Sequence, residues 1–395
     1  MGVTTSSARF TYRLRLGSGA ERLLLSEWDR CRWVWNECVA ASRTAYERGQ
    51  KIGPSMLDKM CTQWRADNEW LRAGTSIPQK QVVRDFSRSR AKAVKDIADR
   101  LPVGRRAGMP GFKKKGTSDP TLNYTRNGFR LKGGKLNLAG GIVANVVWSR
   151  RLPSVPSSVR VYRDPLGHWY ASFVVQTETL PLPVTGAVLG IDWGVKEIAT
   201  TTSGNYDLLH PGFGRKASAK LAALDKAVSR RRRPKGQSLS NGYRTAKRRR
   251  ARLLKKISRQ RQDYGRKWAK KVVRDHDALA VEDFRPKFLA RSTMAKKAAD
   301  AAIAATKHAL VEMSHKHGRT VLLVHPAHTT MDCAQCGARA KHALPLGERT
   351  YTCIACGAVS PRDKNSARVM LNRAGLNPDG ADRGRPLRSP TGKAA

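Results

Sequence analysis

The spacing of apolar residues divides the N-terminal half of the chain into a strand, several helices and a β-rich segment. Residues 8–16 alternate apolar and polar side chains, which predicts a strand. Apolar residues at helical spacing predict a helix over about 20–50 and further helices over 55–100. From about 100 to 182 the apolar runs are short and broken by Gly, Pro and Asn, which predicts β-structure with a hairpin over 158–176.

From about 187 onward, short apolar runs alternate with helical segments. Strands are predicted over 188–192, 198–202, 278–282 and 320–324, and helices over 215–275, 299–313 and 363–373, with a break near 234–236. The last twenty or so residues are rich in Gly, Pro and Arg, which predicts disorder.

The charge of the chain indicates a polyanionic partner. Its 395 residues include 76 Lys and Arg against 30 Asp and Glu, a formal net charge of +46. A charge of that size repels itself unless a polyanion neutralises it, and nucleic acid is the expected polyanion. No long apolar span and no signal-peptide core are visible, so we expect no membrane contact and a place in the bacterial cytoplasm or nucleoid.

Four of the seven cysteines form two C-x-x-C pairs near the C-terminus, Cys333 with Cys336 and Cys353 with Cys356. The sixteen residues between the pairs fit a zinc ribbon, and a glycine follows each pair. Four thiolates fill a tetrahedral shell, so we expect one structural zinc ion. The other three cysteines stand apart in the N-terminal third, which fits a reducing compartment.

Three acidic residues stand in settings that indicate a second kind of metal site. Asp192 and Glu282 each end a predicted strand, and Asp363 follows the cysteine module in Arg362-Asp363-Lys364-Asn365. Clustered carboxylates can hold two Mg²⁺ ions, which activate a water and stabilise the leaving oxygen in phosphodiester hydrolysis. The alternative interpretation of each acid, taken alone, is a solvated carboxylate at a strand end.

A long basic stretch lies between the first two of these acids. Arg230–Arg233, Lys247–Arg250 and Lys255–Lys256 carry charge of one sign, while apolar residues recur on one helical face at Leu254, Ile257, Tyr264, Trp268 and Val272. One face therefore packs and the other is cationic. We expect the cationic face to contact a phosphate backbone without reading bases, the alternative being a solvated helix face.

The order of these motifs resembles the TnpB family of transposon-encoded RNA-guided nucleases, to which compact type V CRISPR effectors are related. The resemblance rests on Gly190–Val195, Val281–Phe284, the four-cysteine ribbon and Arg362–Ala367. In the N-terminal half, Cys31–Asn36, Gly108–Lys113, 124–138 and 162–170 are also similar to the family, so the resemblance covers about residues 8 to 373. Where the family often has a second Asp two residues before the last acid, this chain has Pro361.

The resemblance implies a multidomain α/β fold. An RNase H-like RuvC nuclease domain would contain an inserted zinc ribbon, and an N-terminal β-barrel wedge domain would contain an inserted helical recognition domain. The implied ranges are 1–18 and 100–182 for the wedge domain, 19–99 for the recognition domain, 183–332 and 357–374 for the RuvC-like domain, 333–356 for the ribbon, and 375–395 for a disordered tail.

The resemblance also implies an Mg²⁺-dependent, RNA-guided DNA endonuclease. Asp192, Glu282 and Asp363 would hold two Mg²⁺ ions, a guide RNA would choose the target in double-stranded DNA, and the protein would read a short motif beside it. The helix that opens near Pro78 is our candidate reader of that motif. The residues assigned to nucleic acid are Gln79, Lys80, Gln81, Arg84, Lys113, Lys114, Arg230, Arg231, Arg232, Arg233, Lys247, Arg248, Arg249, Arg250, Lys255 and Lys256.

Three other functions stay open at this point. A non-cleaving guided DNA-binding repressor or transposition accessory protein would not need the intact acidic triad. A structure-specific nuclease such as a junction resolvase would need neither the basic N-terminal half nor the ribbon. A zinc-ribbon protein of the ribosome would not need the acids. The sequence does not separate a transposon-encoded protein from a compact CRISPR effector.

Overall fold

The computed structural model describes residues 5–116, 118–234, 236–284, 289, 292–342, 344–345 and 347–376. The chain divides into two compact units, one of Ser7–Thr177 and one that begins at Glu178. Most of the predicted C-terminal tail, residues 377–395, lies outside the described residues. None of the described helices is long and apolar enough to span a membrane.

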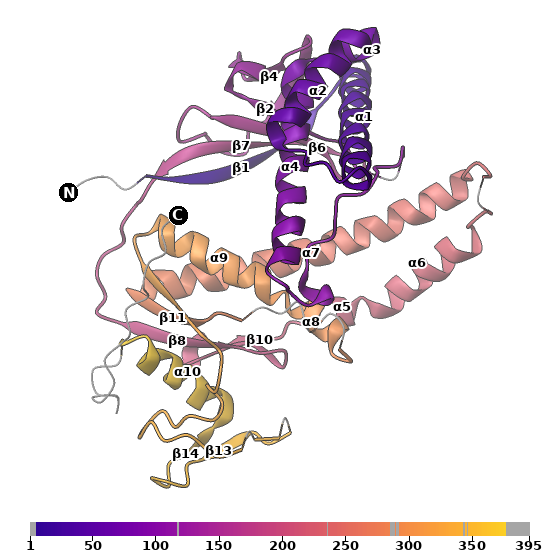
Figure 1. Cartoon of the computed structure of the whole chain (residues 1–395). Coiled ribbons are helices and arrows are strands. Elements are labelled where there is room, and N and C mark those ends of the chain that lie inside the picture. Colours follow the sequence, from indigo (N-terminus) through magenta and orange to yellow (C-terminus); the bar gives the residue numbers. More distant parts are fainter. Residues whose placement is uncertain are drawn as a thin grey trace. The chain divides into compact units, whose positions relative to one another are not determined.

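A seven-stranded sheet forms one layer of the N-terminal unit (Figure 1). Its strand order is β2-β6-β7-β1-β5-β4-β3, so the first strand of the chain lies in the middle. Alternate side chains of β5 are buried, as expected for a sheet that is covered on one face. The strands are β1 (Thr5–Arg15), β2 (Thr121–Thr125), β3 (Phe129–Lys132), β4 (Lys135–Leu138), β5 (Ile142–Val147), β6 (Ser158–Arg163) and β7 (Trp169–Glu178).

Helices pack together and against strands of this sheet, and the core is continuous between helices and strands. Leu24, Leu57 and Phe86 of the helices belong to the same buried cluster as Tyr12 and Phe173 of the sheet. The helices are α1 (Ser18–Glu47), α2 (Pro54–Asp67), α3 (Glu69–Arg72) and α4 (Ser76–Ala98), with 3₁₀ turns at Val103–Arg105 and Arg126–Gly128. Whether this unit is two domains, as the resemblance implies, stays a prediction.

A five-stranded mixed sheet forms the centre of the C-terminal unit. Its order is β10-β9-β8-β11-β12, with β8 parallel to β11, β11 parallel to β12, and β9 antiparallel to both β8 and β10. The strands are β8 (Val188–Trp193), β9 (Glu197–Thr201), β10 (Leu208–Leu209), β11 (Ala278–Glu282) and β12 (Thr320–Val324). A 3₁₀ turn at Gly204–Tyr206 connects β9 to β10.

Helices cover both faces of this sheet (Figure 1). On one face, Trp268 of α7 and Leu310 of α9 pack on Leu189 and Val281, and on the other face Met370 of α10 packs against residues of β11 and β12. Helix α6 runs beside α7 as a helical hairpin. The helices are α5 (Phe213–Lys216), α6 (Ser218–Arg230), α7 (Asn241–Asp275), α8 (Ala295–Ala301), α9 (Ile303–Lys316) and α10 (Arg362–Arg373).

The cysteine module forms a small two-stranded sheet that precedes α10. Strand β13 (Thr350–Thr352) pairs antiparallel with β14 (Val359–Pro361), and the sequence pattern did not predict either strand. The predicted helix over 299–313 is in fact two helices, because Ala302 adopts a left-handed conformation with a φ of 53° between α8 and α9.

Candidate active site and metal centre

Strand alternation places two of the predicted acids on the same face of the C-terminal sheet. In β8, Leu189 and Ile191 face α7 and α9, so Gly190 and Asp192 face α10. In β11, Val281 faces α7 and α9, so Glu282 also faces α10. Because β8 and β11 are parallel and Ile191 pairs with Val281, Asp192 and Glu282 lie at the carboxyl ends of neighbouring strands.

The side chains of Asp192 and Glu282 are in direct contact. The two carboxyl groups lie within hydrogen-bonding reach of each other, and each affects the pKa of the other. One oxygen of Glu282 also accepts a hydrogen bond of 3.2 Å from the backbone N–H of Trp193. Glu282 is buried and Asp192 is half-buried, so water screens the two carboxyl groups poorly.

The pKa values of both carboxyl groups are raised. Burial is the largest cause of the raised pKa of Asp192, and the nearby carboxylates of Glu282 and Asp363 raise it further. Burial also raises the pKa of Glu282 to about 7, although the Trp193 N–H and Lys307 act in the opposite direction. Paired carboxyls that resist ionisation in a half-buried site are stabilised as anions when a cation binds between them.

The third predicted acid, Asp363 of α10, lies near these two, but the three carboxylates do not all come within 4.8 Å of one another. Asp363 lies in the first turn of α10, where the helix dipole favours a negative charge, and it is close enough to Asp192 to affect its pKa. Pro361, which replaces the family's second Asp, precedes the helix at its N-cap position with a φ of −55° that suits a helix start. Arg349, which precedes β13, forms an ion pair of 3.6 Å with Asp363.

A close approach of α10 to β8 makes this arrangement possible. A Cβ atom on Gly190 would lie 2.1 Å from the carbonyl oxygen of Ala367, so only glycine allows the helix to cross the strand at this distance. Lys364, beside Asp363, donates to the backbone oxygen of Thr201 at 2.8 Å and pairs with Asp207 at 2.6 Å. Helix α10 is therefore fixed against both β8 and the segment that follows β9.

The four predicted zinc ligands come together at the tip of the cysteine module. The sulfur atoms of Cys333, Cys336, Cys353 and Cys356 all lie within 4.8 Å of one another, and no other such cluster of ligand atoms is found among the described residues. The Cys336–Cys353 and Cys333–Cys356 sulfur distances are 3.5 and 3.8 Å. A tetrahedral shell with Zn–S distances of about 2.3 Å requires about 3.8 Å between sulfurs, so the donor set fits one zinc ion.

The backbone of each knuckle has the conformation that the C-x-x-C-Gly pattern predicts. Gly337 and Gly357 have φ values of 73° and 72°, and their N–H groups donate to the carbonyls of Cys333 and Cys353 at 3.0 and 2.9 Å. A side chain at either glycine would be strained in this conformation. Both glycines therefore serve the turn that wraps two thiolates around one ion.

One predicted base-reading residue on α4 is contradicted by the structure. Gln79 is fully buried, accepts a hydrogen bond of 2.6 Å from Arg65 and donates to the backbone oxygen of Leu71 at 3.1 Å. Its amide joins α4 to the preceding helices and does not face solvent. Arg84 is exposed, Gln81 is half-buried, and Lys80 pairs with Asp58 at 3.3 Å, so the prediction for α4 stands on the exposed residues alone.

Lys113, another predicted nucleic-acid residue, also makes contacts within the protein. Its ammonium group lies 3.6 Å from the ring centroid of Trp35 and 5.3 Å from that of Trp28, and burial lowers its pKa. The Asn36 side chain bonds both the N–H and the carbonyl of Lys113, at 2.8 and 3.2 Å. Lys113 therefore attaches its segment to α1, whereas Lys114 is exposed, and the nucleic-acid contact of both stays a prediction.

The basic stretch retains most of its expected exposure. Arg230–Arg233, Lys247–Arg249 and Lys256 are exposed, Lys255 is half-buried, and Arg250 is half-buried because it pairs with Asp225 of α6. Most of these residues lie on α7 and on the connection from α6 to α7. Their contact with nucleic acid stays a prediction.

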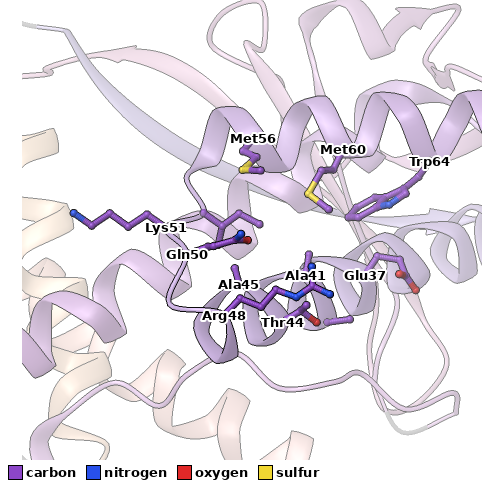
Figure 2. A pocket seen from close by; sticks show the side chains of 12 residues that line it. Glu37, Ala41, Thr44, Ala45, Arg48, Gln50, Lys51, Met56, Met60 and Trp64 are labelled. Carbon is purple, nitrogen blue, oxygen red and sulfur yellow. The ribbon is translucent and has the colours of Figure 1, made fainter.

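An apolar cleft of about 310 Å³ opens between α1 and α2 in the N-terminal unit (Figure 2). Met56, Met60 and Trp64 of α2 face Ala41 and Ala45 of α1 across it. Glu37 is the one acidic residue among those that line the cleft, so it has no cluster of carboxylates or thiolates for metal-assisted chemistry. The acidic cluster of the C-terminal unit is the better candidate for a catalytic site.

Sequence reasoning missed the residues that surround the three acids. Lys307 of α9 pairs with Asp283 at 2.7 Å and affects the pKa of Glu282, and no motif in the sequence indicated it. Arg349 was missed for the same reason. Asn365 was visible within the Arg362–Ala367 motif, but the pattern did not say what its buried amide contacts.

Two known protein families match the segments of the chain that carry the candidate site residues. Residues 172–293, which contain Asp192 and Glu282, match the OrfB_IS605 family, described as a probable transposase. Residues 306–370, which contain the four cysteines and Asp363, match the Cas12f1-like TNB domain.

Two relatives extend the similarity over most of the chain. A protein of Streptomyces pristinaespiralis, named as a candidate RNA-guided DNA endonuclease, is 29% identical over 353 residues, which cover 87% of this chain and 83% of the relative. A protein of Escherichia coli (strain K12) with the same description is 26% identical over 387 residues, which cover 92% and 91%. The resemblance to the TnpB family is confirmed.

The chain also aligns with solved structures. A complex of Cas12f1 with guide RNA and target DNA aligns with 95% of this chain and 99% of the Cas12f1 chain, at a TM-score of 0.44 and 13% identity.

Proposed function

We propose that this protein is an RNA-guided DNA endonuclease that hydrolyses phosphodiester bonds at a RuvC-like carboxylate site. The observation that carries the proposal is the contact between Asp192 and Glu282, two half-buried or buried carboxyls on parallel strands, with Asp363 of α10 beside them. The five-stranded mixed sheet, covered on both faces, supports the RNase H-like assignment of this unit. The names of the two relatives support the guided activity.

Two Mg²⁺ ions would be held by the carboxylates of Asp192, Glu282 and Asp363, and would supply activation of the attacking water and charge stabilisation at the leaving oxygen. The protein's own contribution is to hold Asp192 and Glu282 together, and Asp363 near them, against their mutual repulsion. The Trp193 N–H holds one oxygen of Glu282, and the close packing of α10 on Gly190 holds Asp363 near the strand ends. Lys307 keeps Asp283 paired, so Asp283 is not a member of the cluster.

A guide RNA and a double-stranded DNA target are the proposed partners. Pairing of the RNA with one DNA strand would supply sequence choice, so the protein would need only to bind backbones and a short duplex motif. The exposed cations of the basic stretch suit the backbone contact, and the net charge of +46 suits two polyanionic partners. We place the protein in the bacterial cytoplasm or nucleoid, where both partners are found.

The decisive test replaces each acid in turn. Asp192→Ala, Glu282→Ala and Asp363→Ala should each abolish cleavage of a guide-matched DNA while target binding persists, because the carboxylates serve the metal ions and the ions serve the chemistry. Addition of EDTA should stop cleavage by the wild type in the same way. A gel assay of cleavage beside a binding assay at equal protein concentration separates the two effects.

Glu312→Ala is the matched control, because Glu312 is a surface carboxylate that pairs with Arg266. It should cut like the wild type. Full cleavage by any one of the three acidic variants would remove that residue from the site. Guided binding without cleavage by the wild type, at any divalent cation concentration, would instead support the non-cleaving repressor or accessory function.

A further inference from the structure

A buried asparagine joins the first zinc knuckle to the helix that carries Asp363. Asn365 lies two residues after Asp363 in α10 and is 3% exposed. Its side-chain N–H donates to the backbone oxygen of Asp332 at 2.7 Å, and its side-chain oxygen accepts from the backbone N–H of Ala334 at 3.0 Å. Asp332 and Ala334 flank Cys333, so both ends of this amide bind the backbone of the first zinc knuckle.

The far end of α10 contacts the same knuckle independently. Asn372 donates to the backbone oxygen of Ala334 at 2.7 Å, and Arg373 pairs with Asp332 at 2.5 Å. These two residues lie about two helical turns beyond Asn365, away from Asp363. The cysteine module therefore stays attached to α10 when the Asn365 bonds are removed, whereas the first turn of the helix loses its main contact with the knuckle.

We propose that Asn365 is a positioning residue that makes the placement of Asp363 depend on an intact zinc knuckle. The inference rests on the proposed function, because it assumes that Asp363 binds a divalent cation. Four thiolates around one ion fix the knuckle backbone, and the knuckle backbone fixes the Asn365 amide. A buried amide that loses both partners must move to find others, and Asp363 moves with it because it shares the same helical turn.

Residues that orient metal ligands typically change metal affinity by 10- to 100-fold when they are replaced. Asn365→Ala should therefore raise the Mg²⁺ concentration that half-saturates the acidic cluster by at least about tenfold. The readout is the rise in thermal midpoint of the protein without nucleic acid as Mg²⁺ is added. The same shift should appear in the Mg²⁺ dependence of target cleavage, and metal analysis should still find one zinc per chain.

The Asn365→Asp variant distinguishes an effect of side-chain position on Mg²⁺ binding from an effect of charge. The variant fills the same volume and keeps the acceptor for the Ala334 N–H, but it loses the donor to the Asp332 carbonyl. Its added negative charge near Asp363 would, by itself, tighten cation binding. Weaker Mg²⁺ binding in Asn365→Asp therefore reports lost positioning. Asn372→Ala is the matched control, since it removes a bond to the same knuckle at the far end of α10, and its Mg²⁺ half-saturation should equal that of the wild type.

Two results would overturn the inference. One is an unchanged Mg²⁺ half-saturation in both Asn365 variants, and the other is loss of zinc from Asn365→Asp, which would make the residue part of ribbon folding alone. Failure of the proposed function looks different, because the wild type itself would then show no Mg²⁺-dependent thermal shift and no guided cleavage.

Discussion

At the scale of single residues, the candidate site depends on one small residue, Gly190, as well as on its three acids. Gly190 has an ordinary negative φ, so its backbone does not require glycine. Its requirement is spatial, since Ala367 of α10 occupies the place of a Cβ atom. The distance between helix and strand at this point sets how closely Asp363 can approach Asp192.

Gly190→Ala should therefore separate the acids without removing any of them. Overpacking of this kind typically costs about 1–3 kcal/mol of stability, and here the added methyl group meets backbone that cannot rotate away. We expect a lower thermal midpoint together with a reduced cleavage rate. Chemical denaturation and a cleavage time course measure the two effects.

Gly204→Ala is the control for this prediction, because the nearest atom to its added Cβ is the side-chain nitrogen of Lys364 at 3.8 Å, an ordinary contact. It should behave as the wild type does in both assays. A fully stable and active Gly190→Ala protein would show that α10 can shift without consequence, contrary to the packing described above.

Residue-level prediction from sequence was reliable where a local rule fixes the direction of the side chain. The C-x-x-C-Gly pattern fixes a knuckle, and strand alternation fixes the side on which Asp192 and Glu282 lie. It did not predict the burial of Gln79, because the helical period of α4 does not tell which face the rest of the protein covers. It also did not predict the ring contacts of Lys113, because nothing in the sequence indicates that Trp28 and Trp35 bind an ammonium group.

At the scale of elements, periodicity predicted β8, β9, β11 and β12 of the C-terminal sheet and the long basic helices. It did not predict the break at Ala302, because alanine is the strongest helix former and only tertiary packing imposes a left-handed conformation there. It also missed β10, β13 and β14, which are two or three residues each and too short to show alternation. Local sequence patterns also do not predict the order of the strands in either sheet.

The cysteine module is the element whose stability should depend on metal. We predict one tightly held zinc per chain, and Cys353→Ser should lower solubility and cleavage together, because structural zinc contributes folding free energy directly. Metal analysis of the purified wild type, with sedimentation of both proteins after expression, measures the outcome. A wild type without zinc would count decisively against the ribbon.

At the scale of the whole molecule, composition alone predicted a nucleic-acid partner, and the described structure adds where exposed cations are concentrated.

We predict that the basic stretch binds phosphates and reads no bases. Arg231, Arg232, Arg248 and Arg249 changed together to Gln should weaken binding equally for unrelated guides and make its salt dependence shallower. Each lost duplex contact should reduce the log–log slope by about 0.9, or by about 0.7 for a single strand. Binding over a salt series with two unrelated guides measures it.

Arg126, Arg130, Lys132 and Lys135, exposed around the β3–β4 hairpin, provide a control with the same loss of charge. Equal effects from both fourfold variants would assign the result to net charge and not to the basic stretch. An unaltered salt-dependence slope in the variant of the basic stretch would contradict the prediction. A loss of binding confined to one guide would indicate base readout.

The order of the acids along the chain also governs when they can act during synthesis. Asp192 and Glu282 come from strands that are far apart in sequence, and Asp363 arrives only with α10, after the cysteine module. The N-terminal unit is continuous from Ser7 to Thr177 and can fold first as the chain leaves the ribosome. A nascent chain therefore exposes its N-terminal unit well before its three carboxylates can assemble, and a ribosome that stalls before codon 363 releases a protein whose acidic cluster is incomplete.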